Sequence, residues 1–306
     1  MINTAICLFV YNRSRHTNQV LKSLSKCKNF KKFPLYIFSD NFNSSKKNDK
    51  FEVNLVRNKI LNFKKKNKNI FIKFLKTNLG LYKNLTGGIS YVLSKHPSVI
   101  VLEDDLILDE NFLNFMSSSL QKFKDKKNIS QISGYSYPIN CNSNVAYFLK
   151  LTSCWGWATW SDRWRDFIKF SKNKKLIQQE FNNIQSNYSK KSEFNINGSY
   201  NYLKMLKKQM TNKINSWGIL FYLYSFHKNF LNLFPPFTLV ENTGFDGSGF
   251  HKSTSNVFNR VVHKSKCKKI KYPSINKLNN HNQRQVGYFL LKELSLGRKI
   301  INYLFK

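Results

Sequence analysis

The chain has 306 residues, 41% of them hydrophobic and 15% aromatic, which is enough for one large domain or two small ones with a substantial core. Its formal net charge of +35, from 51 Lys and Arg against 16 Asp and Glu, predicts attraction to anions such as nucleic acid, anionic lipid or a phosphorylated substrate. Because 43 of the basic residues are Lys, spread along the whole chain, and only 8 are Arg, the composition argues against a base-reading groove.

Strands and helices are predicted to alternate through the first third of the chain. The predicted order is strand 4–10, helix 15–28, strand 35–38, helix 43–69, strand 70–75, helix 82–95 and strand 99–102. The strand at 99–102 is an apolar run without polar alternation, which is typical of a strand covered on both faces. We therefore predict an α/β fold with a mostly parallel central sheet and helices on both faces.

The second half has a less regular pattern. The segments expected there are helix 109–126, strands 129–133 and 145–150, helical segments within 172–213, helix 216–228, strands 231–234 and 237–240, and an amphipathic helix 284–304. Residues 252–282 between the last two are basic and expected to be loose. No segment reaches the roughly 18 apolar residues of a membrane-spanning helix.

Three consecutive acids, Glu103, Asp104 and Asp105, follow the apolar strand 99–102. Ligands of open α/β sheets bind at the carboxyl ends of strands, and adjacent carboxylates repel one another unless a cation joins them. Hard oxygen ligands suit Mg²⁺ or Mn²⁺, which also bind phosphates. The alternative is an acidic start to the next helix, where Asp and Glu are favoured.

Other polar side chains also follow predicted strands. Asn12 and Arg13 come after the first strand, Asp40 after the second, and Asn78 after the third. Because the carboxyl ends of parallel strands meet at one edge of the sheet, these residues and the three acids should form a pocket.

Four tryptophans lie within ten residues, at positions 155, 157, 160 and 164. They fit either a core cluster beneath a loop or a platform on which sugar rings stack. A second cluster, ENTGFDGSGFH at 241–251, has three glycines that allow a tight phosphate-facing loop, and His251 is a candidate metal ligand or an unliganded loop histidine.

Cysteine usage and the N-terminus indicate the compartment. The five cysteines are odd in number and form no CxxC pair, which disfavours a disulfide framework or structural zinc site and fits a reducing cytoplasm. The N-terminal sequence has no basic region before its short apolar run, so we expect a strand there and not a signal peptide.

The order of these motifs over residues 4–251 resembles the GT-A glycosyltransferases, most closely bacterial surface-polysaccharide enzymes similar in pattern to N-acetylglucosaminyltransferase I. The matching motifs in chain order are FVYNRS, IFSD, NLGLYKN, LEDD, CWGWATW, SWG and TGFDGSGFH. The resemblance implies a domain at 1–251, with a nucleotide-binding part at 1–108 and an acceptor-side part at 109–251. The remaining 252–306 would form a basic tail with a C-terminal helix.

The resemblance also implies roles for individual residues. Donor-binding residues would be Tyr11, Asn12, Arg13, Asp40, Asn78, Lys83, Glu103, Asp104 and Ser248. Metal ligands would be Asp105 and His251, and acceptor-side residues would be Trp155, Trp157 and Trp217. A nucleotide-diphosphate leaving group needs a divalent cation, Mn²⁺ or Mg²⁺, to offset its developing charge.

One position departs from the family pattern. Inverting members have an acid directly after the tryptophan of the Trp-acid motif, where it acts as the general base, and this chain has Gly218 there. Asp246 and Glu241 are the nearest acids in the corresponding region, and Asp246, between glycines, has more freedom. It is the candidate base, and the stereochemical outcome stays open.

The resulting prediction is a metal-dependent glycosyltransferase that moves a hexose or N-acetylhexosamine from a nucleotide-diphosphate donor, expected to be a UDP-sugar, to a glycan or lipid-linked acceptor. Surface polysaccharide or lipooligosaccharide synthesis would place it in the cytoplasm, peripheral to an anionic membrane surface, with no nucleic-acid partner. The alternatives are a nucleic-acid-binding protein, suggested by the charge and the 42 Phe and Tyr, and a catalytically impaired scaffold, suggested by Gly218.

Overall fold

An eight-stranded sheet lies at the centre of the computed structural model, which describes residues 3–139, 141, 144–248 and 269–304. Its strand order is β3-β2-β1-β4-β8-β6-β9-β7. The strands are β1 (Thr4–Val10), β2 (Leu35–Ser39), β3 (Ile70–Phe74), β4 (Ser98–Glu103), β6 (Ile129–Ser133), β7 (Tyr147–Leu149), β8 (Trp157–Trp160) and β9 (Leu231–Phe234). Strands β1 to β4 are parallel, and β8 and β7 are antiparallel to their neighbours, so the predicted mostly parallel sheet is confirmed.

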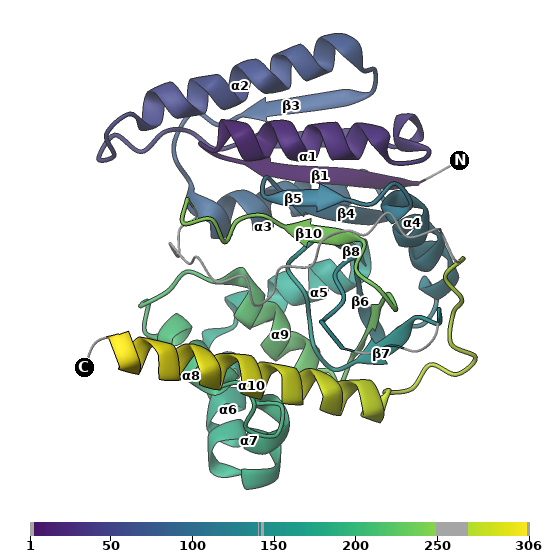
Figure 1. Cartoon of the computed structure of the whole chain (residues 1–306), viewed down its shortest axis with the longest axis vertical. Helices are drawn as coiled ribbons and strands as arrows, with labels where there is room; N and C mark the ends of the chain where they lie inside the picture. The colour runs from purple at the N-terminus through teal and green to yellow at the C-terminus, as the bar shows by residue number, and fades with distance from the viewer. Residues whose placement is uncertain (1–2, 140, 142–143, 249–268, 305–306) are drawn as a thin grey trace.

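Helices cover both faces of this sheet, as predicted (Figure 1). One face packs against α1 (Ser14–Lys26), α2 (Asp49–Lys66) and α4 (Phe112–Phe123). The other packs against α3 (Gly80–Leu93), α5 (Ser161–Lys172) and α9 (Trp217–His227). All residues of β1 are buried, which explains its unbroken apolar run, since a strand between two helical layers has no solvent face.

The outer layer of the second half contains α6 (Lys174–Ser186), α7 (Tyr188–Phe194), α8 (Tyr202–Met210) and α10 (Asn280–Leu304). The C-terminal helix α10 buries Val286 and Leu290 in the same cluster as α9, so its first part packs on the preceding residues. Within the parts of the chain described here, no helix is both long and apolar enough to cross a membrane. Most of the segment 252–282, which we expected to be loose, lies outside the described residues.

Two short strands were not predicted. Strand β5 (Leu106–Leu108) follows the acids and pairs antiparallel with β10 (Val240–Asn242), which begins where the strand predicted at 237–240 should end. Strand β8 runs through the tryptophan segment and inserts between β4 and β6. These pairings bring the start of the glycine-rich segment beside the acidic turn, and the Trp157 end of β8 beside the end of β4.

Candidate active site at the carboxyl ends of β1 and β4

The acidic residues and the Tyr-Asn-Arg turn meet because β1 and β4 are parallel neighbours. Phe9 of β1 lies opposite Glu103 of β4, so both strands end at the same level of the sheet. The residues that follow, Arg13 on one side and Asp104 and Asp105 on the other, therefore face one another. The sequence predicted this convergence.

Arg13 binds two of the three acids. Its Nη2 donates to Asp104 Oδ1 and, at 2.9 Å, to Asp105 Oδ2. Burial alone would lower the pKa of Arg13, but the two carboxylates raise it, so the guanidinium stays charged. The Asp104 side chain is 6% exposed and that of Asp105 is 16%, so Asp105 is the more accessible.

Glu103 has a different environment. No residue in the described ranges donates a hydrogen bond to its half-buried carboxyl group. Burial, followed by the charges of Asp105 and Asp104, raises the pKa of Glu103 to about 8. The three adjacent acids thus have distinct environments: Glu103 has a raised pKa, Asp104 is tightly paired with Arg13, and Asp105 is the more accessible to solvent.

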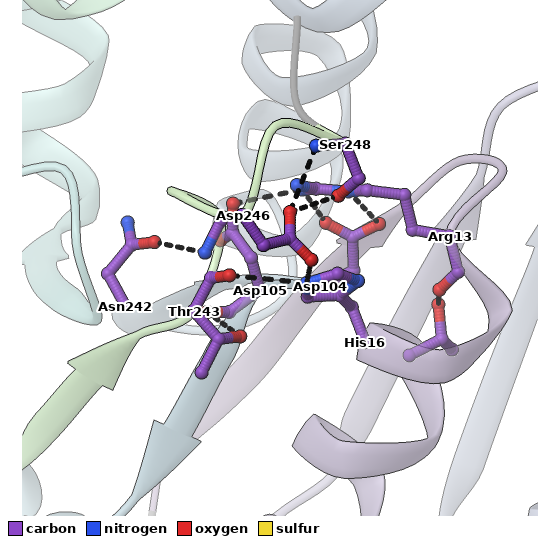
Figure 2. Close-up of polar contacts among 10 residues, drawn as sticks. Arg13, His16, Asp104, Asp105, Asn242, Thr243, Asp246 and Ser248 are labelled. Carbon is purple, nitrogen blue, oxygen red and sulfur yellow. Dashed lines mark hydrogen bonds and ion pairs between the residues drawn. The ribbon is translucent and has the colours of Figure 1, made fainter. Parts of the chain in front are cut away.

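The glycine-rich loop after β10 lies on this acidic turn (Figure 2). The Thr243 backbone N–H and hydroxyl both donate to the Asp105 carbonyl, at 2.8 and 3.0 Å. Gly244 follows directly, and a Cβ at that position would collide with the Asp105 carboxylate. Glycine therefore lets this loop approach the acid without displacing its carboxylate.

Asp246 faces the same cluster from above in Figure 2, where it contacts His16. Its Oδ2 lies 3.2 Å from His16 Nε2, and Ser248 donates to its Oδ1 from both the backbone and the hydroxyl. The structure thus brings Asp246 and Ser248 to the predicted site. His251, the second expected metal ligand, lies outside the described residues.

Asp40 has a structural role that we did not predict. Its buried carboxylate accepts hydrogen bonds from the backbone N–H groups of Asn41, Leu79 and Gly80, each at 2.9 Å. It therefore joins the end of β2 to the start of α3. A contact from Asp40 to the nucleotide stays a prediction.

Two other expected donor-side residues flank Asp40. Asn78 donates from its side chain to the Asn41 carbonyl at 2.6 Å, and Lys83 is exposed in the first turn of α3. Both therefore lie at the rim of the carboxyl edge, and their contacts to a donor stay predictions.

Asp49 was missed by the sequence analysis. It is the first residue of α2, is 3% exposed, and accepts hydrogen bonds from Tyr11 and Asn12. The available signal was Asp49 itself, one of only two acids, with Glu52, in the Lys- and Asn-rich segment that follows the second strand.

The acceptor-platform prediction for Trp157 and Trp217 is wrong. Trp157 is 0% exposed and Trp217 3%, and their rings stack on each other with centroids 5.0 Å apart. They form a closed aromatic block together with Trp164, Phe167 and Phe221. The core-cluster alternative is correct, because the antiparallel strand β8 directs Trp157 into the interior.

Trp155 alone of the three predicted acceptor residues is part-exposed. It packs edge-on against Tyr135 and Phe245 with centroids 4.6 and 5.6 Å away, beside the glycine-rich loop. An acceptor contact through Trp155 stays a prediction.

The packing at Gly218 leaves little room for a larger residue. A Cβ there would lie 2.9 Å from the Cys154 sulfur, so a larger residue requires this neighbour to move. The absence of an acid at this position is therefore consistent with the local packing.

The residues of this site fit a divalent cation only if a bound ligand, such as a phosphate group, supplies part of its coordination. Within the described ranges, no three His, Cys, Asp or Glu side chains are arranged to hold a metal. The accessible carboxylate of Asp105 is a hard oxygen ligand, and Mg²⁺-type ions commonly bind through one or two carboxylates plus substrate phosphates. The residues present fit such a shared site.

A cavity of about 1030 Å³ lies at the opposite edge of the sheet. It is lined by Thr4 and Ser98, the first residues of β1 and β4, and by the polar face of α4. It does not include the acidic cluster, so we do not assign it to the candidate active site.

No protein-family model matches this chain, and a search of curated proteins finds no match. Similar solved structures include "Mannosyltransferase PcManGT from Pyrobaculum calidifontis in complex with GDP-Man and Mn2+" (8% identity, TM-score 0.39, covering 56% of this chain and 46% of that one). Another is S. aureus TarS 1-349 with UDP (16% identity, TM-score 0.36, covering 58% of this chain and 54% of that one). A third is GalNAc-T7 with UDP, GalNAc and Mn²⁺ (10% identity, TM-score 0.46, covering 78% of this chain and 43% of that one). The similar region spans less than two thirds of each of those chains. Such partial similarity does not assign an activity to this chain.

Proposed function

We propose that this chain is a metal-dependent glycosyltransferase that uses a nucleotide-diphosphate sugar, with a UDP-sugar as the expected donor. The observation that carries the proposal is the convergence of Arg13, Asp104, Asp105 and the Gly244 loop at the carboxyl ends of two parallel strands. A cation-binding carboxylate beside a fixed guanidinium and a close-fitting glycine loop suits a diphosphate group. The order of the sequence motifs supports the same interpretation.

In this proposal the donor lies along the carboxyl edge of the sheet. Tyr11 and Asn12 bind the nucleoside, Arg13 and Ser248 face the diphosphate, and Asp105 provides the protein ligand to Mn²⁺ or Mg²⁺. The cation, when bound, offsets the negative charge that develops on the leaving diphosphate. Asp104 holds the Arg13 guanidinium in a fixed orientation, so no rearrangement is needed as that charge appears.

Asp246 remains our proposed proton acceptor for the attacking hydroxyl. The hydrogen bonds from the Ser248 side chain and backbone lower the pKa of Asp246 more than burial raises it, so it is ionised at neutral pH. Asp246→Asn should abolish transfer to an acceptor while nucleotide binding persists. Wild-type transfer by this variant would remove the assignment.

A thermal-shift series separates the proposal from nucleic-acid binding. The melting temperature should rise with UDP or GDP in the presence of Mn²⁺, and EDTA should remove the rise. GDP-mannose and UDP-N-acetylglucosamine belong in the panel of donors. Stabilisation by a polynucleotide only, falling steeply with salt, would favour the nucleic-acid alternative.

A glycan or lipid-linked acceptor at an anionic membrane surface is a further part of the proposal. The net charge of +35 supports it, as do the exposed Tyr288 and Leu291 on the outer side of α10. Each basic residue near such a surface contributes about 1 kcal/mol. The protein should sediment with phosphatidylserine vesicles and not with neutral ones, and equal sedimentation with both would contradict an electrostatic membrane contact.

A further inference from the structure

Asp49 is a nearly inaccessible carboxylate at the start of a surface helix. Its relative exposure is 3%, although α2 presents most of its length to solvent. Burying a charged carboxylate is costly unless hydrogen bonds compensate it, so its partners show what holds it in place.

All three hydrogen bonds to the Asp49 carboxylate come from outside α2. Tyr11 donates its hydroxyl to Oδ2, Asn12 donates its side-chain amide to Oδ1 at 2.5 Å, and the Asn43 backbone N–H donates to Oδ2 at 2.6 Å. An acid in the first turn of a helix commonly caps that helix, but here the carboxylate binds other segments. Its role is therefore to connect loops.

The connected loops follow two adjacent strands. Tyr11 and Asn12 come directly after β1, and Asn43 comes shortly after β2, which is paired with β1 in parallel register. One carboxylate thus fixes both loops at the edge of the sheet where the acidic cluster lies.

The charge of Asp49 is maintained in this position. Burial would raise the pKa of Asp49, but the hydrogen bonds from Tyr11, Asn43 and Asn12 lower it below its ordinary value. Burial and the nearby Asp49 carboxylate raise the pKa of Tyr11, so its hydroxyl remains a donor at neutral pH.

The turn formed by residues 11–13 is held at both ends. Arg13 is bound by Asp104 and Asp105, and Tyr11 and Asn12 are bound by Asp49. Tyr11, Asn12 and Arg13 are each part-exposed, so they can still contact a ligand at this edge. The two anchors act on different halves of one turn.

We propose that Asp49 is a positioning residue for the nucleoside half of the donor, holding Tyr11 and Asn12 in the orientation in which they bind it. This inference rests on the proposed function, because it requires a nucleotide donor at this edge. It assigns the two ends of the turn to different parts of the ligand: Asp49 supports the nucleoside end, and Asp104 and Asp105 support the diphosphate end.

Calorimetric titration with two ligands tests this division. The probes are UDP (or GDP, if the wild-type protein binds it more tightly) and inorganic pyrophosphate, each with Mn²⁺. In Asp49→Asn the dissociation constant for the nucleoside diphosphate should rise about tenfold, equal to about 1.4 kcal/mol, while that for pyrophosphate stays unchanged. Equal weakening of both ligands, or no change in either, would overturn the inference.

Two further variants keep the test decisive. Tyr11→Phe removes one donor to Asp49 without changing the fold of α2, and it should show the same selective loss, smaller than that of Asp49→Asn. The double variant should lose less than the sum of the two, because both act through one contact. Additive losses would contradict that coupling.

Asp109→Asn is the matched control. Asp109 is also buried, at 6% exposure, and also fixes a local turn, since it accepts from the Asn111 backbone and side chain. It follows β5 and packs near Cys27 at the end of α1, away from the acidic cluster. This variant should bind both ligands like the wild type.

A wild-type protein that binds neither UDP nor GDP would instead refute the proposed function.

Discussion

The two regions with the most unusual residue patterns have opposite characters in the structure. At the carboxyl edge of β1 and β4, charged side chains, among them the part-exposed Arg13 and Asp105, contact one another across segments far apart in sequence. Beneath α9, Trp157, Trp164 and Trp217 form a closed block with almost no exposed surface. The first region leaves charged groups within reach of a ligand, and the second stabilises the fold beside it.

The difference shows which kind of pattern can be interpreted without a structure. Polar residues after parallel strands must meet at one edge, whatever the packing elsewhere. The exposure of an aromatic residue depends on which elements cover it, and no local pattern contains that information.

The largest expected effect is on the aromatic block. Trp157→Ala should lower the free energy of unfolding by about 3–5 kcal/mol, because a fully buried side chain is replaced by a cavity. Chemical denaturation would measure this, with Trp155→Ala, at a part-exposed position, as the milder control. A Trp157→Ala protein of wild-type stability with impaired acceptor use would restore the platform interpretation.

A smaller effect is expected where the glycine loop meets the acidic turn. Gly244→Ala places a methyl group against the Asp105 carboxylate and should weaken binding of a nucleoside diphosphate with Mn²⁺ about tenfold, or 1.4 kcal/mol. Gly87→Ala is the matched control, since nothing lies within 4 Å of its added Cβ in α3. Wild-type affinity in Gly244→Ala would show that the loop does not lie as described when ligand is bound.

Acidification should reveal the smallest effect, at Asp49. Because the folded-state pKa of Asp49 lies below its ordinary value, its stabilisation is present above about pH 4 and is lost as pH falls through the folded pKa. At pH 7, Asp49→Asn should be about 1 kcal/mol less stable than the wild type. Denaturation at a series of pH values should show this difference shrinking below pH ~4, and a constant difference would contradict the assignment.

Much of the first half of the fold was predictable. The strands at residues 4–10 and 35–39 lack alternation because both faces are covered, and the helices between them show clear apolar spacing. The boundaries of β8 and β10 were not predictable, because these short strands form only through pairing with β4 and β5.

Within the site, Arg13, Asp104, Asp105, Asp246 and Ser248 were predicted and do converge. The roles of Asp40 and Asp49 were not foreseen. Each carboxylate serves the backbone or side chains of another segment, and such a partner is known only after the chain folds. The sequence thus indicated where the charged groups lie. It did not indicate which of them hold the others in position.

The most direct test of the central claim is release of nucleoside diphosphate from a panel of nucleotide sugars, with Mn²⁺ and with EDTA. The wild-type protein should release product only with the metal. Asp105→Ala should reduce the rate by about 10²–10³-fold, the usual effect of losing one group that stabilises transition-state charge, with the unfolding midpoint unchanged. Release that is independent of metal, or an Asp105→Ala protein that is as fast as the wild type, would contradict the account.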